Sequence, residues 1–217
     1  MAYTGNVIVG GPADERDLPG LSIRKVSVGP MDNNCYLLRC AETGEQLLID
    51  AANDAETLLG LVGDAGLSTV VTTHQHWDHI QALEAVVGPT DAQTVASAED
   101  APAIPVRTSL LVGDGDEIAV GRVPLQIIHL VGHTPGSIAV LYQPTEGAPH
   151  LFTGDSLFPG GPGRTTSPED FTSLMDDLER KVFGQLPDET WVYPGHGKDT
   201  TLGAERPHLG EWRARGW

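Results

Sequence analysis

The stretch TTHQHWDHIQA, residues 72–82, places His74, His76, Asp78 and His79 within six residues, directly after a run of β-branched residues. Histidine packs poorly in a core, and aspartate is almost never buried without a partner. Side chains two apart in an extended chain point the same way, so His74 and His76 can reach one point. Asp78 and His79 are adjacent and converge only if the chain turns there toward a following helix. The stretch therefore offers two pairs of ligands, one for each of two metal ions.

Further candidate ligands stand just beyond predicted strands, in the segments GHTPGS, TGDSLF and YPGHG. Each lies beside glycine, where backbone can approach a bound group closely. They are His133, Asp155 and His196. Three other histidines lack such surroundings, and we expect them on the surface or in ordinary packing. These are His129, His150 and His208.

The apolar pattern around these segments predicts strands and helices in two similar halves. Strands are expected at 21–29, 33–41, 45–51, 67–73, 137–144, 150–155 and 189–195, with a hairpin at 116–132. Helices are expected at 54–66, 79–88 and 167–186, the last capped by Ser167 and Pro168. The Gly- and Pro-rich stretch that starts at residue 158 is expected to be a mobile loop. Strands followed by helices, twice over, predict a layered α/β sandwich.

Composition limits the classes of protein that fit. The chain has 217 residues, 40% of them apolar, and we expect one soluble domain spanning residues 1–217. Its net charge of −17 argues against nucleic acid and anionic membranes as partners. No apolar stretch reaches membrane-spanning length, and the N-terminal residues show no signal features, so we expect a cytoplasmic protein. Cys35 and Cys40, an odd number of residues apart on one strand, point to opposite faces and predict no disulfide.

The four motifs THQHWDH, GHTPGS, TGDSLF and YPGHG, in this order, resemble those of the metallo-β-lactamase superfamily. The resemblance covers nearly the whole chain. Within the superfamily the chain is most similar to the glyoxalase II group, the hydroxyacylglutathione hydrolases, in a short form without the C-terminal helical domain. The resemblance implies a four-layer αβ/βα sandwich with a dinuclear metal site at the strand ends.

The resemblance also implies a role for each candidate residue. His74, His76 and His133 would hold the first metal ion, Asp78, His79 and His196 the second, and Asp155 would bridge the two. Asp50, which ends the segment LLID, would hold ligands in place without binding metal itself. Asp78 and Asp155 are the residues expected to be catalytic. Zinc is the first expectation for both ions, while iron and manganese accept the same ligands.

The expected activity is hydrolysis of a small-molecule thioester by a metal-bridging hydroxide. Arg164, nine residues after Asp155, matches a basic residue that contacts the thiol part of the substrate in the glyoxalase II group. Thr166 departs from the group, whose longer members carry an aromatic hydroxyl there, so glutathione is not fixed as the thiol. Arginine outnumbers lysine ten to three, which is typical of GC-rich genomes and keeps mycothiol as an alternative. A monomer or a homodimer is expected.

Three other functions remain open at this point. A persulfide dioxygenase of the same fold would use a single iron held by positions like His74, His133 and Asp155. A lactonase or β-lactamase, or a metal-binding scaffold without activity, is also compatible with the fold. His196 favours two metal ions over one, and the intact ligand set argues against a scaffold. Trp77 is expected either to line the pocket or to pack.

Overall fold

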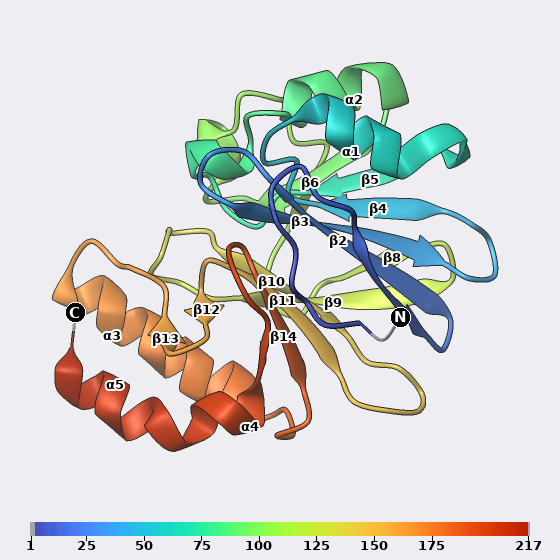
Figure 1. The fold of residues 1–217 in the computed structure, drawn as a ribbon. Coiled ribbons are helices and arrows are strands. Elements are labelled where there is room, and N and C mark those ends of the chain that lie inside the picture. The colour runs from blue at the N-terminus through green and yellow to red at the C-terminus, as the bar shows by residue number, and fades with distance from the viewer. Residues whose placement is uncertain (1–2, 217) are drawn as a thin grey trace.

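The computed structural model describes residues 3–216 and shows two large β-sheets stacked face to face (Figure 1). The first sheet has seven strands in chain order, antiparallel from β1 to β4 and parallel from β4 to β7. Its strands are β1 (Asp14–Leu18), β2 (Leu21–Val28), β3 (Asn33–Cys40), β4 (Gln46–Ile49), β5 (Thr69–Val71), β6 (Gln93–Ser97) and β7 (Leu110–Val112).

The second sheet has the strand order β15-β14-β11-β10-β9-β8, and only β11 and β14 in it are parallel. Its strands are β8 (Glu117–Val120), β9 (Val123–His129), β10 (Ile138–Tyr142), β11 (His150–Gly154), β14 (Trp191–Pro194) and β15 (Thr200–Thr201). The predicted hairpin at 116–132 is confirmed as β8 and β9. The stretch that starts at residue 158, expected to be a mobile loop, contributes instead to a small hairpin of β12 (Leu157–Phe158) and β13 (Gly161–Pro162).

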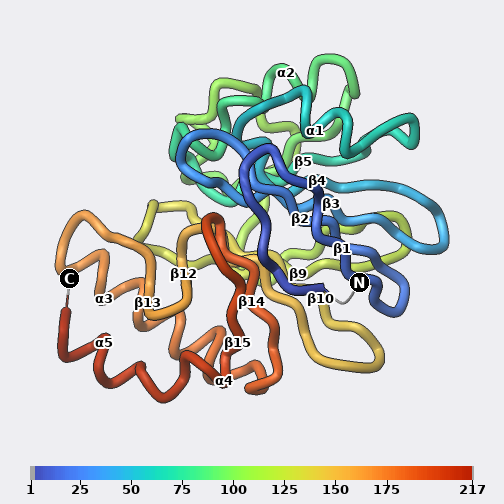
Figure 2. Tube along the Cα trace, viewed as in Figure 1, coloured from blue at the N-terminus to red at the C-terminus, as the bar shows by residue number. Residues whose placement is uncertain are grey.

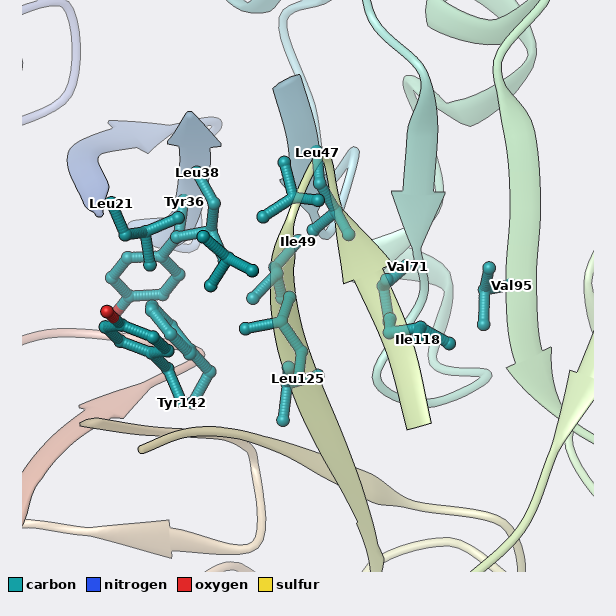
Figure 3. Close-up of a cluster of buried hydrophobic side chains, with 14 of the residues drawn as sticks. Leu21, Tyr36, Leu38, Leu47, Ile49, Val71, Val95, Ile118, Leu125 and Tyr142 are labelled. Carbon is teal, nitrogen blue, oxygen red and sulfur yellow. The ribbon is translucent and has the colours of Figure 1, made fainter. Parts of the chain in front are cut away.

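Alternation of buried side chains explains why these segments are strands with two covered faces. In β4, Leu47 and Ile49 point between the two sheets, while Leu48 points outward to the helices. Figure 3 shows the cluster between the sheets, where side chains from both halves of the chain interdigitate. Cys35 and Cys40 lie on opposite faces of β3, buried and unbonded, as predicted.

Helices cover the outer face of each sheet and complete the four layers (Figure 1). α1 (Ala55–Val62) and α2 (Leu83–Thr90) pack on the first sheet, and α3 (Pro168–Asp177) and α5 (Leu209–Arg215) pack on the second. The short α4 (Leu202–Glu205) precedes α5. The αβ/βα sandwich predicted from the sequence is confirmed.

Two predicted helices have different boundaries in the structure. α2 begins at Leu83 rather than at residue 79, because Gln81 and Ala82 donate their backbone N–H groups to Ala52 and Ala51 instead of entering a helix. α3 begins at Pro168, capped by Ser167 as predicted, and continues after Asp177 as a wider π-helical segment, Leu178–Phe183. Among residues 3–216, no helix is both long and apolar enough to cross a membrane. The tube view shows the loops after β5, β9, β11 and β14 gathered near one end of the two sheets (Figure 2).

Candidate metal centre

Loops from both halves of the chain bring the predicted ligands to one place at the ends of the sheets. β5 ends at Val71, three residues before His74, and β11 ends directly before Asp155. β14 ends at Pro194, two residues before His196. Ends of strands suit such a site because the rigid sheet fixes where each loop starts.

The first group of candidate ligands is His74, His76 and His133, whose ring nitrogens fit within one metal-sized cluster. The rings of His74 and His76 lie 4.8 Å apart, centroid to centroid, as their spacing of two in extended chain predicts. The ring of His133 lies 4.8 Å from that of His74 and 4.5 Å from that of His76. The three rings therefore surround one point.

The second group is Asp78, His79 and His196. The chain turns through a single 3₁₀ turn at Trp77–His79, which brings the adjacent Asp78 and His79 to the same side, as predicted. His79 Nε2 lies 3.6 Å from Asp78 Oδ2 and 3.2 Å from His196 Nε2. His196 Nε2 lies 3.3 Å from the same Asp78 oxygen.

Asp155 lies between the two groups. One of its carboxylate oxygens, Oδ2, is 3.6 Å from His133 Nε2 in the first group and 3.4 Å from His196 Nε2 in the second. The other oxygen, Oδ1, is 3.4 Å from His79 Nε2. A carboxylate in this position can touch ions held by either group.

Four of the histidines are oriented in the same manner. Each uses Nδ1 in a hydrogen bond to an oxygen outside the cluster and turns Nε2 inward, the arrangement found around protein-bound metals. Nδ1 of His133 donates to the backbone carbonyl of Arg164 at 2.7 Å, and Nδ1 of His196 donates to that of Met31 at 2.9 Å. The remaining two histidines of this kind are His74 and His79.

Asp50 holds one histidine from each group. It follows β4 in a left-handed backbone conformation, φ 58°, and its carboxylate is buried. Its Oδ2 accepts Nδ1–H of His79 at 2.9 Å and the hydroxyl of Thr73 at 2.7 Å. Thr73 Oγ1 in turn lies 3.0 Å from Nδ1 of His74, which donates to it. The predicted supporting role of Asp50 thus has a geometric basis on both sides of the cluster.

The charges of the cluster fit divalent cations. Burial, with the neighbouring His79 ring, holds the pKa of His74 well below its ordinary value, so this ring is neutral and its Nε2 lone pair is free. Burial opposes protonation of His79 as well, but the charge of Asp50 and the contact with Asp155 together raise its pKa to about 10. The pKa of Asp155 falls far below its ordinary value despite burial, because the rings of His196 and His79 each bring Nε2 within 3.4 Å of its carboxylate oxygens. A neutral His74 ring and an ionised Asp155 carboxylate are both in the form that binds a metal cation.

Buried polar atoms without hydrogen-bond partners also indicate that this cluster fits metal ions. Nε2 of His74, Nε2 of His133 and Oδ1 of Asp155 are buried without a hydrogen bond of good geometry among the described residues. Buried polar atoms are rarely left in this state, and each such atom calls for an explanation. All three face the interior of the cluster, where metal coordination would satisfy them. The residues present therefore fit a pair of bound metal ions.

Asp100 is a supporting residue that the sequence reasoning missed. Its carboxylate, 1% exposed, accepts the backbone N–H of Gln75 at 2.9 Å, between His74 and His76. It also accepts the hydroxyl of Thr134 at 2.6 Å, next to His133, and the N–H of Gly136 at 2.8 Å. Asp100 therefore ties together the two loops that form the first group. β6, which ends three residues before Asp100, was not among the predicted strands, so no signal in the sequence marked this residue.

The structure also places the residues whose roles were open. Trp77 is 60% exposed, so it does not pack in the core. Thr166 donates its hydroxyl to Asp170 in the first turn of α3. Asn33, which was expected only to lie in a strand, donates to Asp78 Oδ2 at 2.9 Å and was missed as a site residue. The side chain of Arg164 is exposed beside the cluster. The remaining histidines, His129, His150 and His208, bond elsewhere.

A histidine and aspartate cluster at the strand ends of an αβ/βα sandwich defines a class of metal-site proteins. The model of the metallo-beta-lactamase superfamily matches residues 28–196, most of the chain. The chain belongs to the metallo-β-lactamase superfamily.

One relative and two solved structures show which members of the superfamily the chain is similar to. A hydroxyacylglutathione hydrolase from Thermosynechococcus vestitus is 36% identical over 170 residues, which are 76% of this chain and 64% of that protein. The chain thus spans less than two thirds of that relative. The structure of ETHE1 from Myxococcus xanthus is 34% identical, with a TM-score of 0.74, and the match covers 86% of this chain and 82% of that one. The structure of TTHA1623 in a di-iron-bound form is 32% identical, with a TM-score of 0.70, over 84% of this chain and 96% of that one.

Proposed function

We propose that this protein is a metal-dependent thioesterase that cleaves S-acyl conjugates of a low-molecular-weight thiol. The observation that carries the proposal is the division of seven inward-facing side chains into two ligand groups with Asp155 between them. The similarity to hydroxyacylglutathione hydrolases supports the choice of a thioester among the possible substrates. Zinc is our first choice of metal, and iron or manganese would accept the same donors.

Two divalent ions, when bound, would supply a hydroxide at neutral pH and polarise the acyl carbonyl. His74, His76 and His133 would hold one ion, and Asp78, His79 and His196 the other. The role of Asp155 is to keep the two groups at a fixed separation through its contacts on both sides. Asp50 and Asn33 fix the orientation of their partner ligands, so that little rearrangement is needed when substrate binds.

The leaving group explains why few other catalytic groups are needed. A thiol has a pKa of about 8.5, so a thiolate departs near neutral pH without a protein acid. An amide would require protonation of a far more basic amine. Arg164, exposed beside His133, would contact the thiol portion of the substrate. Because the ligands come from both sheets, we further propose that residues 1–217 act as one domain.

A mononuclear-iron persulfide dioxygenase is the second candidate, and the similarity to ETHE1 gives it some support. That function would need only His74, His133 and Asp155. The second ligand group, with Asp78 and His196 converging on His79, would then have no purpose. The complete second group favours the hydrolase.

The experiment that separates these functions measures metal and reaction together. The purified protein is analysed for metal per chain and supplied with a series of thioesters, with released thiol followed by a colorimetric reagent. Oxygen uptake is recorded separately with a glutathione persulfide. The variant Asp155→Ala tests the cluster, and His208→Ala, an exposed histidine outside it, is the matched control.

We expect about two metal ions per chain, release of thiol and no oxygen uptake. Asp155→Ala should lose metal and hydrolysis together, while His208→Ala should keep both. One iron per chain with oxygen uptake would establish the dioxygenase instead. Full metal content and full rate in Asp155→Ala would refute the assigned site.

A further inference from the structure

Lys25, on β2, is fully buried although it belongs to neither group of candidate ligands. It lies on the same face of the strand as Leu21 and Ile23, which belong to the apolar cluster between the two sheets. Lysine is almost never fully buried unless its charge is paired. The partners of Lys25 therefore indicate what it does.

The Lys25 ammonium group has three partners, one for each of its N–H donors. Nζ forms an ion pair with Asp199 Oδ1 at 2.6 Å, and it donates to the carbonyl oxygens of Gly197 and Gly5, both at 2.8 Å. Gly197 and Asp199 are one and three residues after His196. Two of the three partners of Lys25 therefore lie in the loop that carries a candidate ligand.

This loop is held on both sides of His196. Before it, the carbonyl oxygen of Gly195 accepts the backbone N–H of Asn34 at 2.7 Å. After it, the chain turns at Gly197, whose φ of 69° lies in the left-handed region that favours glycine. The Gly197 carbonyl oxygen accepts from Lys25 Nζ and, at 3.0 Å, from Asn34 Nδ2. The later side of the loop thus depends on a buried charge.

Asp199 joins the loop to two further segments. Its Oδ2 accepts the hydroxyl of Tyr3 at 2.6 Å and Nε1–H of Trp191 at 2.9 Å. Gly5 packs directly against this carboxylate, since a Cβ on Gly5 would come within 2.5 Å of Asp199 Oδ2. Lys25, Asp199 and the segment that carries Tyr3 and Gly5 therefore form one buried network.

Packing restrains His196 less than the other two members of the second ligand group. Its side chain is 22% exposed, whereas those of His79 and Asp78 are 0% and 9% exposed. Outside the cluster, the His196 ring is oriented by the bond from Nδ1 to the carbonyl oxygen of Met31. The place of Nε2 therefore depends on where the backbone of the loop is held, and Lys25 holds the part that follows His196.

We propose that Lys25 is a positioning residue for His196, and that its pairing with Asp199 determines whether the second ligand group binds a metal ion tightly. The proposal rests on the proposed two-metal thioesterase function and adds two residues that lie outside the ligand set. Removing one partner of a buried ion pair leaves the other charge unpaired, whereas replacing both partners by neutral groups is far less disruptive. The single and the double replacement can therefore separate positioning from folding.

The test measures metal binding by the chelator-treated protein, independently of activity. Zinc is titrated by calorimetry into the wild type, Lys25→Met and the double variant Lys25→Met/Asp199→Asn, in which no buried charge is left unpaired. Val26→Ala is the matched control, because Val26 is the next buried residue of β2 and points toward the helices. Circular dichroism checks the fold of each variant, and thioester hydrolysis is measured on the same proteins.

We expect about two tightly bound ions per chain in the wild type and in Val26→Ala. In both Lys25 variants, one ion should bind about tenfold more weakly or not at all. The other ion should bind as in the wild type, because no hydrogen bond found within residues 3–216 joins Lys25 to the first ligand group.

Combined variants show whether Lys25 acts through His196. Adding Lys25→Met to His196→Ala should cause no further loss of zinc affinity, because the residue through which Lys25 acts is already absent. Adding Lys25→Met to His133→Ala should weaken the one site that remains. A purely structural effect of Lys25 would instead give losses that add in both backgrounds.

The positioning role and the proposed function can fail separately. If no thioester is hydrolysed but the Lys25 variants still lose one ion selectively, the thioesterase function fails and the positioning role stands. If thioesters are hydrolysed and the Lys25 variants bind both ions as tightly as the wild type, the positioning role is refuted and the thioesterase function stands. Equal weakening of both sites, a further loss in the His196→Ala background, or a single ion in the wild type would also refute the positioning role.

Discussion

Asp100 illustrates how a residue far from the ligand motif can control the metal centre. It binds the backbone of Gln75, between two candidate ligands, and the side chain of Thr134, beside a third. We expect Asp100→Asn to weaken metal binding roughly 10- to 100-fold, because an amide nitrogen would face donors that now meet carboxylate oxygens. The loss should affect only the metal site of the first ligand group, His74, His76 and His133. Among the described residues, no hydrogen bond joins Asp100 to Asp78, His79 or His196.

Titration of the metal-free Asp100→Asn variant with zinc, followed by calorimetry, measures this directly. In the variant the two binding steps should separate, with one of them greatly weakened, whereas the wild type should bind both ions tightly. Asp64→Asn, an exposed aspartate near the end of α1, provides the matched control and should titrate like the wild type. Equal loss at both sites, or none, would show that Asp100 does not act on the first ligand group.

At this scale the sequence indicated the candidate ligands but not the residues that support them. His74, His76, Asp78 and His79 stand in one short motif, so their spacing alone indicated a shared site. Asp100 and Asn33 act through contacts between segments far apart in the chain, and a single sequence carries no record of such contacts. Asp50 was identified only because it ends a predicted strand and matches a family motif.

At the scale of elements, α3 carries a cap that the sequence predicted. Ser167 Oγ accepts the N–H of Asp170 at 3.0 Å and donates to the Asp170 carboxylate at 2.8 Å. We expect Ser167→Ala to lower the free energy of unfolding by about 1 kcal/mol, the usual effect of removing a cap. Urea denaturation measures it, with Ser173→Ala, the same change inside α3, as the control. An equal loss in both variants would mean that the cap contributes nothing of its own.

The junction of α3 with the loop before His133 predicts a dependence on pH. Asp177 accepts the N–H of Val131 at 3.1 Å and pairs with Arg180 and Lys181. Burial opposes ionisation of Asp177, but these partners outweigh it and lower the pKa of the carboxyl group below its ordinary value. A lowered folded-state pKa means that the stabilisation is complete above the unfolded pKa of about 3.9 and is lost as pH falls through the folded value.

Asp177→Asn should therefore reduce the free energy of unfolding at pH 7, and its difference from the wild type should shrink as the pH falls below about 3.9. Urea denaturation across this range tests the prediction, again with Asp64→Asn as the control. A constant difference between variant and wild type at every pH would show that packing, rather than the carboxylate charge, accounts for the effect.

Some elements could not be predicted from the sequence. β7 is a three-residue edge strand with Leu110 and Leu111 exposed, so it shows none of the alternation that marks a half-buried strand. α5 has seven residues, of which only Trp212 is buried, so its apolar periodicity is too short to detect. β2 and β3, with eight residues each, were predicted because they are long and clearly apolar.

For the whole molecule, the four layers followed from the repeated order of strands and helices, because each buried sheet face needs a cover. Three apolar clusters, one between the sheets and one under each pair of helices, realise this arrangement. How closely the two halves approach was not predictable from either half alone. Hydrogen bonds between the halves fix this distance. For example, the side chain of Asn34 donates to the carbonyl oxygens of Pro194 and Gly197 in the other half.

Because the metal centre joins both halves, metal binding should stabilise the whole fold. A ligand that binds only the folded state adds about 2.7 kcal/mol when its free concentration is 100 times its Kd. For a chain of this size, each kcal/mol raises Tm by about 2–4 °C, so zinc should raise the Tm of the chelator-treated protein by about 5–10 °C. Differential scanning calorimetry with and without zinc measures this shift.

The control for metal stabilisation uses two histidines of the same chain. His196→Ala removes a candidate ligand that follows a strand of the second sheet and should show a smaller rise in Tm with zinc, whereas His208→Ala, exposed near α5, should show the full rise. The difference between them isolates stabilisation through the cluster from zinc bound elsewhere on an acidic surface. If all three proteins gain equally, zinc acts at other sites. If none gains, metal binding does not couple the two halves of the fold.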